Sequence, residues 1–326
     1  MNLKPDSRAA LLLTSRLGLE ADSELDPLSR RDWNQLERNL SGKGLSPGSL
    51  EGLGANEIRA GFDLDGEQAE RIARLLARGS ELDHELERLE SLGIWVLTRA
   101  DQLYPDRYRL RLKDAAPIVL FGAGNRRLLG ATGLAVAGSR NVDEAGRACA
   151  EFVGGACSDC GLVLYSGAAR GVDSIAMGAA LESGGSAVGV LADSLEKAAR
   201  NRGSQDALEQ GSLALVTSYS PNTVFSVGIA MGRNKLIYAL ADWGLVVASD
   251  AEKGGTWAGA AEVLKNRWVP LFVRGGEDVP EGNRLLINAG ARTFEWPFRR
   301  PGGSLQEWLE ANSNRSDETP VQFSLF

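Results

Sequence analysis

From Gly93 onward, short apolar segments rich in Val, Ile and Leu alternate with stretches of small residues at helical spacing. The apolar segments lack the polar alternation of a strand with one face in water, so they fit a parallel sheet covered on both faces. Expected strands lie at 93–98, 116–122, 133–138, 162–167, 186–192, 212–218, 244–249 and 269–275, and expected helices at 143–159, 173–182, 227–240 and 257–266. This order predicts an α/β fold, an extended Rossmann-like, doubly wound and mostly parallel sheet.

The first 92 residues follow a different pattern. Their apolar residues recur at helical spacing, and Gly and Pro breaks within 42–54 separate the helical segments. We therefore expect three parts: a small helical N-terminal domain over 1–92, a Rossmann-like domain over 93–300, and a C-terminal helix and flexible tail over 301–326. A chain of 326 residues has room for two domains.

Composition excludes several classes of protein. The net charge of −7 argues against indiscriminate nucleic-acid binding by the whole surface, although residues 101–140 carry seven basic and three acidic side chains and so favour a local basic face. No segment resembles a signal peptide or approaches the ~20 apolar residues of a membrane-spanning helix, so we expect a cytoplasmic protein with no membrane partner. Cys157 and Cys160 form a CxxC without a second pair, and His84 is the only histidine. We expect buried thiols on a helix, no metal site and no cofactor.

Three strand-to-helix turns are suited to phosphate. They are Gly138-Ser139-Arg140, the segment SGAARGVD over 166–173, and Lys253-Gly254-Gly255-Thr256, which is expected to open a helix that begins at Trp257. In open parallel sheets ligands bind beyond the carboxyl ends of the strands. Glycine-rich turns at helix N-termini bind phosphate through free amides and the helix dipole. Together the turns predict a phosphate-bearing ligand.

A fourth stretch, MGRNKLIYALAD over 231–242, brings Arg233, Asn234 and Lys235 together inside a helix. One interpretation is an ordinary solvated helix face. The other is a binding face, in which Arg140, Arg170, Arg233 and Lys235 neutralise backbone phosphates, Asn234 orients a phosphate or a base edge, and nearby Tyr or Trp side chains stack on bases.

Several linked motifs carry a resemblance to a known family. AVAGSRNVDEAGR, YSGAARGVDSIAMGAALESGGSAVGVL, GRNKLIYALADWGLVVASDAEKGGTWAGA and GNRLLINAGA occur in this order. Over about residues 92–292 the chain resembles the DNA-processing protein A (DprA/Smf) family. The resemblance implies an extended Rossmann domain after a small helical domain, binding of single-stranded DNA, loading of a RecA-type recombinase, and a homodimer.

The resemblance also implies which residues face the ligand. With the glycine-turn residues found above, the expected DNA- or phosphate-binding set is Gly138, Ser139, Arg140, Gly167, Arg170, Gly171, Asp173, Arg233, Asn234, Lys235, Lys253, Gly254, Gly255 and Thr256. Met177 and Gly178 stand where the family usually has a His-Arg pair, which marks a divergent member. Such proteins also resemble components of anti-phage systems, so a defence role is one expected context.

Two alternatives compete with DNA binding. Nucleotide phosphoribohydrolases of the lysine-decarboxylase-like family share the SGAARG and GGT elements, but their hydrolysis needs a carboxylate shortly after the threonine. Here Ala258 stands two places after Thr256, and the next carboxylate is Glu262. We therefore expect no catalytic residue and no enzyme activity. The other alternative is a nucleotide-signal-binding regulatory or antitoxin partner of a toxin.

The chain ends in an apolar cluster after a polar run over 313–320. Its last residues, QFSLF, resemble the short motif by which proteins bind the bacterial sliding clamp. In that interpretation Gln322 bonds at the pocket rim and Leu325 and Phe326 enter an apolar cleft. Packing of the tail on its own domain is the alternative.

Overall fold

The protein was analysed as a computed structural model, which describes residues 1, 3–20, 22–62, 64–298 and 303–313. Nine strands in these ranges form one sheet in the order β1-β2-β6-β5-β4-β3-β7-β8-β9. They are β1 (Ile94–Thr98), β2 (Val119–Gly124), β3 (Gly133–Gly138), β4 (Val163–Ser166), β5 (Ser186–Val190), β6 (Leu213–Thr217), β7 (Trp243–Ala248), β8 (Leu271–Gly275) and β9 (Arg292–Glu295). Pairing is parallel from β6 through to β9, whereas β1 with β2 and β2 with β6 are antiparallel. The predicted α/β, mostly parallel sheet is confirmed.

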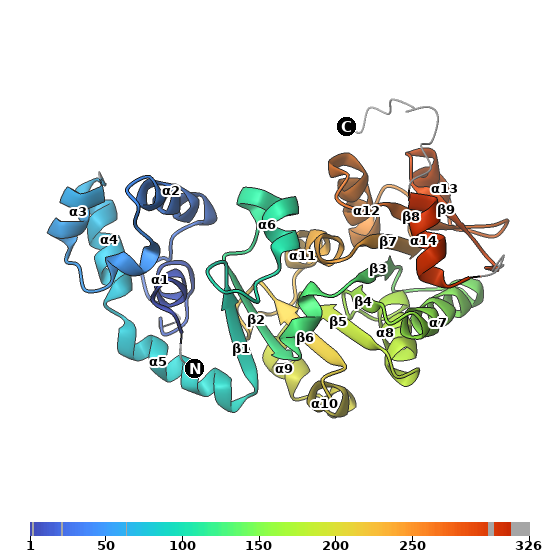
Figure 1. The fold of residues 1–326 in the computed structure, drawn as a ribbon, viewed down its shortest axis with the longest axis horizontal. Helices are drawn as coiled ribbons and strands as arrows, with labels where there is room; N and C mark the ends of the chain where they lie inside the picture. Colours follow the sequence, from blue (N-terminus) through green and yellow to red (C-terminus); the bar gives the residue numbers. More distant parts are fainter. Residues whose placement is uncertain (2, 21, 63, 299–302, 314–326) are drawn as a thin grey trace.

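Helices cover both faces of this sheet (Figure 1). They are α6 (Asp106–Leu112), α7 (Glu144–Asp159), α8 (Val172–Glu182), α9 (Leu195–Ala199), α10 (Arg202–Glu209), α11 (Val227–Leu240), α12 (Gly254–Asn266), α13 (Glu281–Asn288) and α14 (Leu305–Ser313), with 3-10 turns η2 (Lys113–Ala115) and η3 (Arg126–Gly130). Side chains alternate along each strand, so Leu134 and Val136 of β3 join one buried cluster with α7 and α8. Ala135 and Ala137 join the other cluster, with α6, α11 and α12.

Before the sheet come α1 (Pro5–Thr14), α2 (Arg30–Ser41), η1 (Pro47–Leu50), α3 (Ala55–Phe62), α4 (Gly66–Leu76) and α5 (Gly79–Ser91). Figure 1 shows them beside β1, at one edge of the sheet. Their apolar side chains, among them Leu11, Trp33 and Leu40, belong to the same buried cluster as one face of the sheet. The buried guanidinium of Arg78 donates to the carbonyls of Leu12 and Leu17, which satisfies acceptors at the end of α1. The division of the chain into three domains stays a prediction.

One helix boundary differs from the expectation, whereas the predicted burial of thiols on a helix is found for Cys149 and Cys157. The helix expected from Trp257 begins at Gly254, so the Gly-Gly-Thr segment is its first turn and not a preceding loop. Cys149 and Cys157 are buried in α7, and burial raises the pKa of Cys149 to about 12. None of the described helices is both long and apolar enough to cross a membrane.

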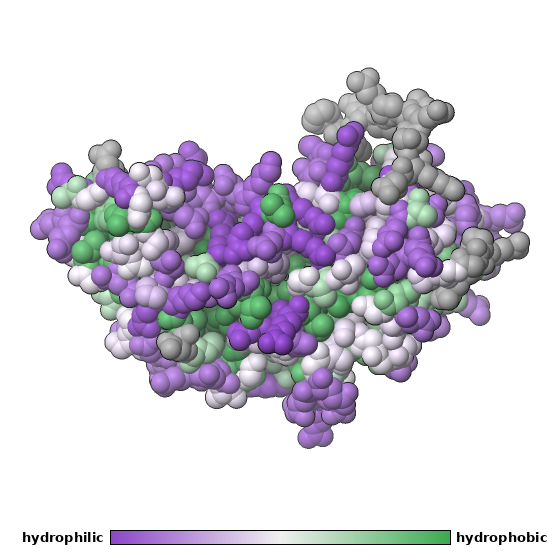
Figure 2. All heavy atoms as spheres, viewed as in Figure 1, coloured by the Kyte–Doolittle hydropathy of each residue, from purple (hydrophilic) through white to green (hydrophobic). Residues whose placement is uncertain are grey.

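Hydrophilic side chains gather over α6 (Figure 2), but its arginines are largely used inside the molecule. Arg107 donates to the carbonyls of Ala131 and Leu240 at 2.6 and 2.7 Å and pairs with Asp242 at 2.8 Å. Arg111 donates to the carbonyls of Ala239 and Ala241, at the C-terminal end of α11. Two of the seven basic residues in 101–140 therefore anchor the end of α11, and the segment forms less free basic surface than expected.

Candidate functional site

A pocket of about 450 Å³ opens at the carboxyl ends of β3 and β7. Its lining comes from the turn 137–141, from Ala169 and Asp173, from Phe225 and Val227 with the inner face of α11 as far as Tyr238, and from the turn 250–256. We call it the sheet-edge pocket. It brings together most of the predicted site residues, from segments more than a hundred positions apart. Gly167, Arg170, Gly171 and Lys235 do not line it.

The turn after β3 is fixed by backbone contacts on two sides. The Ser139 amide donates to the Ala248 carbonyl at 2.8 Å, and the Ser139 carbonyl accepts from Val172 at 3.3 Å. Gly171 has φ +95°, and a Cβ there would lie 2.4 Å from the Ser139 carbonyl oxygen. Only glycine allows both this conformation and this approach, so Gly171 acts on the site by positioning the Ser139-Arg140 backbone.

Arg140 and Phe225 form an exposed rim of the pocket. The Arg140 side chain is exposed, and its guanidinium carbon lies 5.1 Å from the centroid of the Phe225 ring, a cation–π geometry. Phe225 is 40% exposed, and its neighbours Val224 and Val227 are 79% and 69% exposed. Of these, Phe225 and Val227 line the pocket and were not among the predicted site residues. Their sequence signal, an apolar stretch VFSVGIAM before the Arg-Asn-Lys cluster, was too weak to find them.

The Arg233 guanidinium is buried, with the residue only 6% exposed. It donates to the Val190 carbonyl and lies against Gly167, where a Cβ would come within 2.2 Å of its Nη1. Burial lowers the pKa of Arg233, while the nearby Asp173 carboxylate acts in the opposite direction. Burial raises the pKa of Asp173 to about 6, opposed by the charge of Arg233. Arg233 thus forms part of the pocket floor and is not a surface phosphate clamp.

The Arg-Asn-Lys cluster is divided between different surfaces. Asn234 Nδ2 donates to the Gly255 carbonyl at 2.7 Å and so ties α11 to the first turn of α12. Lys235 lies on another face of α11, outside the sheet-edge pocket. Arg170 is exposed on its loop, also outside the pocket. The sequence-based expectation that Arg233, Asn234 and Lys235 come together does not match their side-chain positions.

The first turn of α12 contributes backbone groups to the pocket. Lys253 precedes the helix and is exposed, and Gly254, Gly255 and Thr256 line the pocket as the first helical residues. The first amides of a helix have no intrahelical acceptor, and the helix dipole places partial positive charge there. This turn is therefore suited to an anionic group.

Three polar atoms in the pocket lining have no partner. Asp173 Oδ1, Arg233 Nε and Tyr238 Oη are buried and make no hydrogen bond within the described part of the chain. An unsatisfied buried polar atom costs about 1–3 kcal/mol, and such atoms are rare in native proteins. Three of them in one pocket indicate a polar ligand or bound water. Tyr238 was not predicted, because nothing in the sequence separates it from an ordinary core tyrosine. Within the described ranges, no three His, Cys, Asp or Glu side chains gather as metal ligands would.

Comparisons with known proteins agree with this geometry. The family model described as DNA recombination-mediator protein A matches residues 95–297. DNA processing protein DprA of Streptococcus pneumoniae is 28% identical over 219 residues, which are 65% of this chain and 73% of that protein. An X-ray structure of S. pneumoniae DprA has a TM-score of 0.57 at 21% identity and covers 82% of this chain and 95% of its own.

A second solved structure, of Helicobacter pylori DNA processing protein A, is described by its single-stranded DNA binding mode. Its TM-score is 0.54 at 21% identity, and the match covers 67% of this chain and 95% of that one. These two similarities support the fold. Since the family model spans well over half of the chain, the chain belongs to the DNA recombination-mediator protein A (DprA) family.

Proposed function

We propose that this protein binds single-stranded DNA in the sheet-edge pocket and acts in recombinational DNA processing as a binding protein, not as an enzyme. The observation that carries the proposal is the pocket floor, where three buried polar atoms without a hydrogen-bond partner among the described residues share a pocket with the first turn of α12. The family, and the single-stranded DNA named for the H. pylori relative, indicate which polar ligand to expect.

The charges of the pocket fit a phosphate-bearing strand. Arg233 offsets the buried Asp173 carboxylate, which leaves Arg140 and Lys253 at the rim against Asp250. The amides of the first α12 turn add partial positive charge. Phosphates of a single strand can therefore contact Arg140, Lys253 and these amides.

Phe225 can contact the bases of a single strand, as the basic groups contact its phosphates. Its ring is 40% exposed beside the Arg140 guanidinium. Aromatic side chains at the edge of a basic groove stack on bases of any sequence and contribute about 1–3 kcal/mol per base. An aromatic ring beside a cation at one rim favours a nucleic-acid strand over inorganic phosphate alone.

The phosphoribohydrolase alternative requires a carboxylate shortly after Thr256. Ala258 follows Thr256 by two places, and Glu262 lines a different pocket, with Arg111, Lys113 and Arg267. A carboxylate placed for work on the ribose is thus missing from the expected position. Incubation with nucleoside monophosphates should release no ribose 5-phosphate, and clear release would favour the hydrolase.

DNA binding is best tested at exposed residues, because substituting them leaves the core intact. Reversing Arg233 would place two carboxylates together in the core, so loss of binding there would not separate folding from recognition. Arg140 and Lys253 are exposed, and the double variant Arg140→Glu/Lys253→Glu should abolish binding of a single-stranded oligonucleotide at moderate salt. The matched control is Arg59→Glu/Arg74→Glu, which makes the same charge change at exposed positions of the N-terminal helices. Equal affinity of the two double variants would overturn the assignment.

Finer roles remain proposals from the family resemblance. They are loading of a RecA-type recombinase, a homodimer, a place in anti-phage defence and, as an alternative, partnership with a toxin. The proposed sliding-clamp contact through Gln322, Leu325 and Phe326 lies outside the described residues. We keep it as a proposal because QFSLF resembles the clamp-binding motif.

A further inference from the structure

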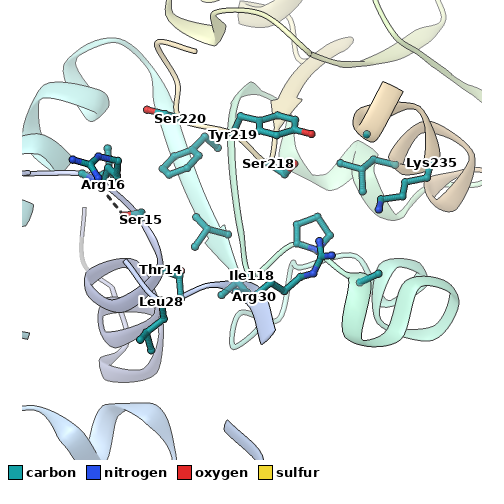
Figure 3. A pocket seen from close by; sticks show the side chains of 17 residues that line it. Thr14, Ser15, Arg16, Leu28, Arg30, Ile118, Ser218, Tyr219, Ser220 and Lys235 are labelled. Carbon is teal, nitrogen blue, oxygen red and sulfur yellow. Dashed lines mark hydrogen bonds between the residues drawn. The ribbon is translucent and has the colours of Figure 1, made fainter. Parts of the chain in front are cut away.

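A second pocket, of about 420 Å³, lies between the N-terminal helices and the sheet (Figure 3). It is lined by the end of α1 and the start of α2, by the segment before β2 with β2 itself, by residues 218–220, and by α11. We call it the helix–sheet pocket. None of its lining residues except Lys235 belongs to the predicted site.

The two pockets share α11 as a wall. Gly232, Lys235 and Leu236 line the helix–sheet pocket, whereas Arg233, Asn234 and Ile237 line the sheet-edge pocket. Residues three and four apart lie on one face of a helix, so these two sets form different faces of α11. A ligand that crosses α11 therefore meets both pockets.

Both pockets also lie at the same edge of the sheet. Residues 218–220 follow the carboxyl end of β6, as the turns of the sheet-edge pocket follow β3 and β7, and all three strands run in the same direction. In the strand order, β6 is three places from β3. Three strand spacings are about 14 Å, which about four nucleotides span even at the close ~3.4 Å spacing of a duplex strand.

The charge of the helix–sheet pocket is one-sided. Arg16, Arg30 and Lys235 line it, and no carboxylate does. In Figure 3, Arg16 and Lys235 lie at opposite ends and Arg30 extends between them. Arg16 pairs at 2.9 Å with Asp26, whose side chain is 76% exposed and which does not line the pocket. The side chains of Arg30 and Lys235 make no hydrogen bond or ion pair with any described residue.

Arg30 is also placed where helix stability does not favour it. It is the first residue of α2, after the capping Ser29, whose hydroxyl accepts from the Asp32 amide. A cation at a helix N-terminus opposes the helix dipole. The pocket also has an apolar lining, which includes Pro117, Ile118 and Leu236 and which we call its floor, and the Tyr219 side chain adds a ring. A cationic rim over an apolar floor complements a nucleotide, whose phosphate is charged and whose base has an apolar face.

We infer that the helix–sheet pocket is a second subsite for the same DNA strand. The strand leaves the sheet-edge pocket, crosses α11 and places a base on the apolar floor, with its phosphates at Arg30 and Lys235. This inference rests on the proposed function. Its consequence is a length dependence, because an oligonucleotide of about two residues is too short to reach both pockets.

The test compares Arg30→Ala with Arg31→Ala, using oligothymidylates of about 2 and about 12 nucleotides. Arg31 is the next residue of α2, is exposed and does not line the pocket, so it controls for the loss of one charge in this helix. Arg30→Ala should weaken binding of the long strand about fivefold and leave the short strand unchanged. The slope of log affinity against log salt should fall by about 0.7 for the long strand only, as expected for one lost phosphate contact.

Each outcome separates the two proposals. If the unaltered protein binds neither strand, the proposed function fails. If it binds both strands, and Arg30→Ala matches Arg31→Ala at both lengths, the second subsite is overturned while the sheet-edge site stands. Arg30→Lys keeps the cation and should retain most of the long-strand affinity; an affinity as low as that of Arg30→Ala would contradict a phosphate contact. Thermal melting of each variant checks that the fold is intact.

Discussion

The Arg233 guanidinium occupies the space that a side chain at Gly167 would need, because a Cβ there would lie 2.2 Å from Nη1 and 2.7 Å from Cζ. Arg233 is also bonded to the Val190 carbonyl and buried, so it cannot move away without losing that hydrogen bond. Because Gly167 has no side chain, the Arg233 guanidinium has room to lie in the pocket floor.

Gly167→Ala should displace the Arg233 guanidinium, lower the free energy of unfolding by about 1–3 kcal/mol and weaken single-stranded DNA binding. Gly178→Ala is the control, since a Cβ there meets nothing within 4 Å and alanine favours a helix interior. Chemical denaturation and a fluorescence titration measure both effects. Unchanged stability and affinity in Gly167→Ala would show that the guanidinium has room to rearrange.

The buried Asp173 carboxyl should make stability depend on pH. Its pKa is raised from 3.8 to about 6, chiefly by burial, with Arg233 as the neighbouring opposing charge. As the pH falls below 6, the Asp173 carboxyl of the folded protein binds a proton, whereas in the unfolded chain it does so only near pH 3.8. The free energy of unfolding therefore rises as the pH falls through this range. Relative to Asp173→Asn, the natural protein should gain about 1.4 kcal/mol per pH unit, about 3 kcal/mol in all, between pH 6 and 4. A difference that stays constant with pH in urea titrations would contradict the raised pKa.

Phe225 should contribute to DNA affinity and little to stability. Its ring is 40% exposed, so Phe225→Ala removes a stacking surface without opening a core cavity. We expect a loss of about 1–3 kcal/mol in binding free energy for single-stranded DNA. The neighbouring Val224→Ala, at a residue 79% exposed and outside the pocket, should bind as the natural protein does. Fluorescence anisotropy with a labelled oligothymidylate measures both; equal affinities would exclude stacking at Phe225.

The tail prediction concerns a protein partner. Deleting Gln322 to Phe326 should abolish capture by an immobilised bacterial sliding clamp while the melting temperature and DNA affinity stay unchanged. Gln322→Ala alone should weaken capture, because the rim hydrogen bond is lost. A fall in melting temperature on deletion would instead favour a tail that packs on its own domain.

The sequence predicted the sheet well because buried parallel strands are almost continuously apolar, as in Leu213–Thr217 and Trp243–Ala248, each buried throughout. Strand β9 was missed because it has four residues, of which only Phe294 is buried. The start of α12 was placed three residues late, since Gly254 and Gly255 are poor helix formers and Gly254 has φ +82°.

The site was only partly predictable for a different reason. Glycine-rich turns can be recognised from a few consecutive residues, so the sequence predicted the segments 138–140 and 253–256. The burial of Arg233 depends on Gly167, Val190 and Asp173, which are 43 to 66 positions away in the sequence. A local sequence pattern cannot show that Arg233 lies in the pocket floor, that Asn234 bonds the neighbouring helix α12, and that Lys235 lines the helix–sheet pocket.

Helix α11 is held more firmly at its C-terminal end than at its start. Arg107 and Arg111 donate to carbonyls of its last turn and of Ala241, whereas Val227 and Met231 near its start are 69% and 46% exposed. Amide hydrogens from Leu236 onward should therefore exchange with solvent through global unfolding, and those of Ala230 and Met231 through local opening of the first turns. The first turns of α11, with Val227 and Met231 at the pocket, can open and close while the later turns, with the buried Arg233 and Tyr238, stay folded.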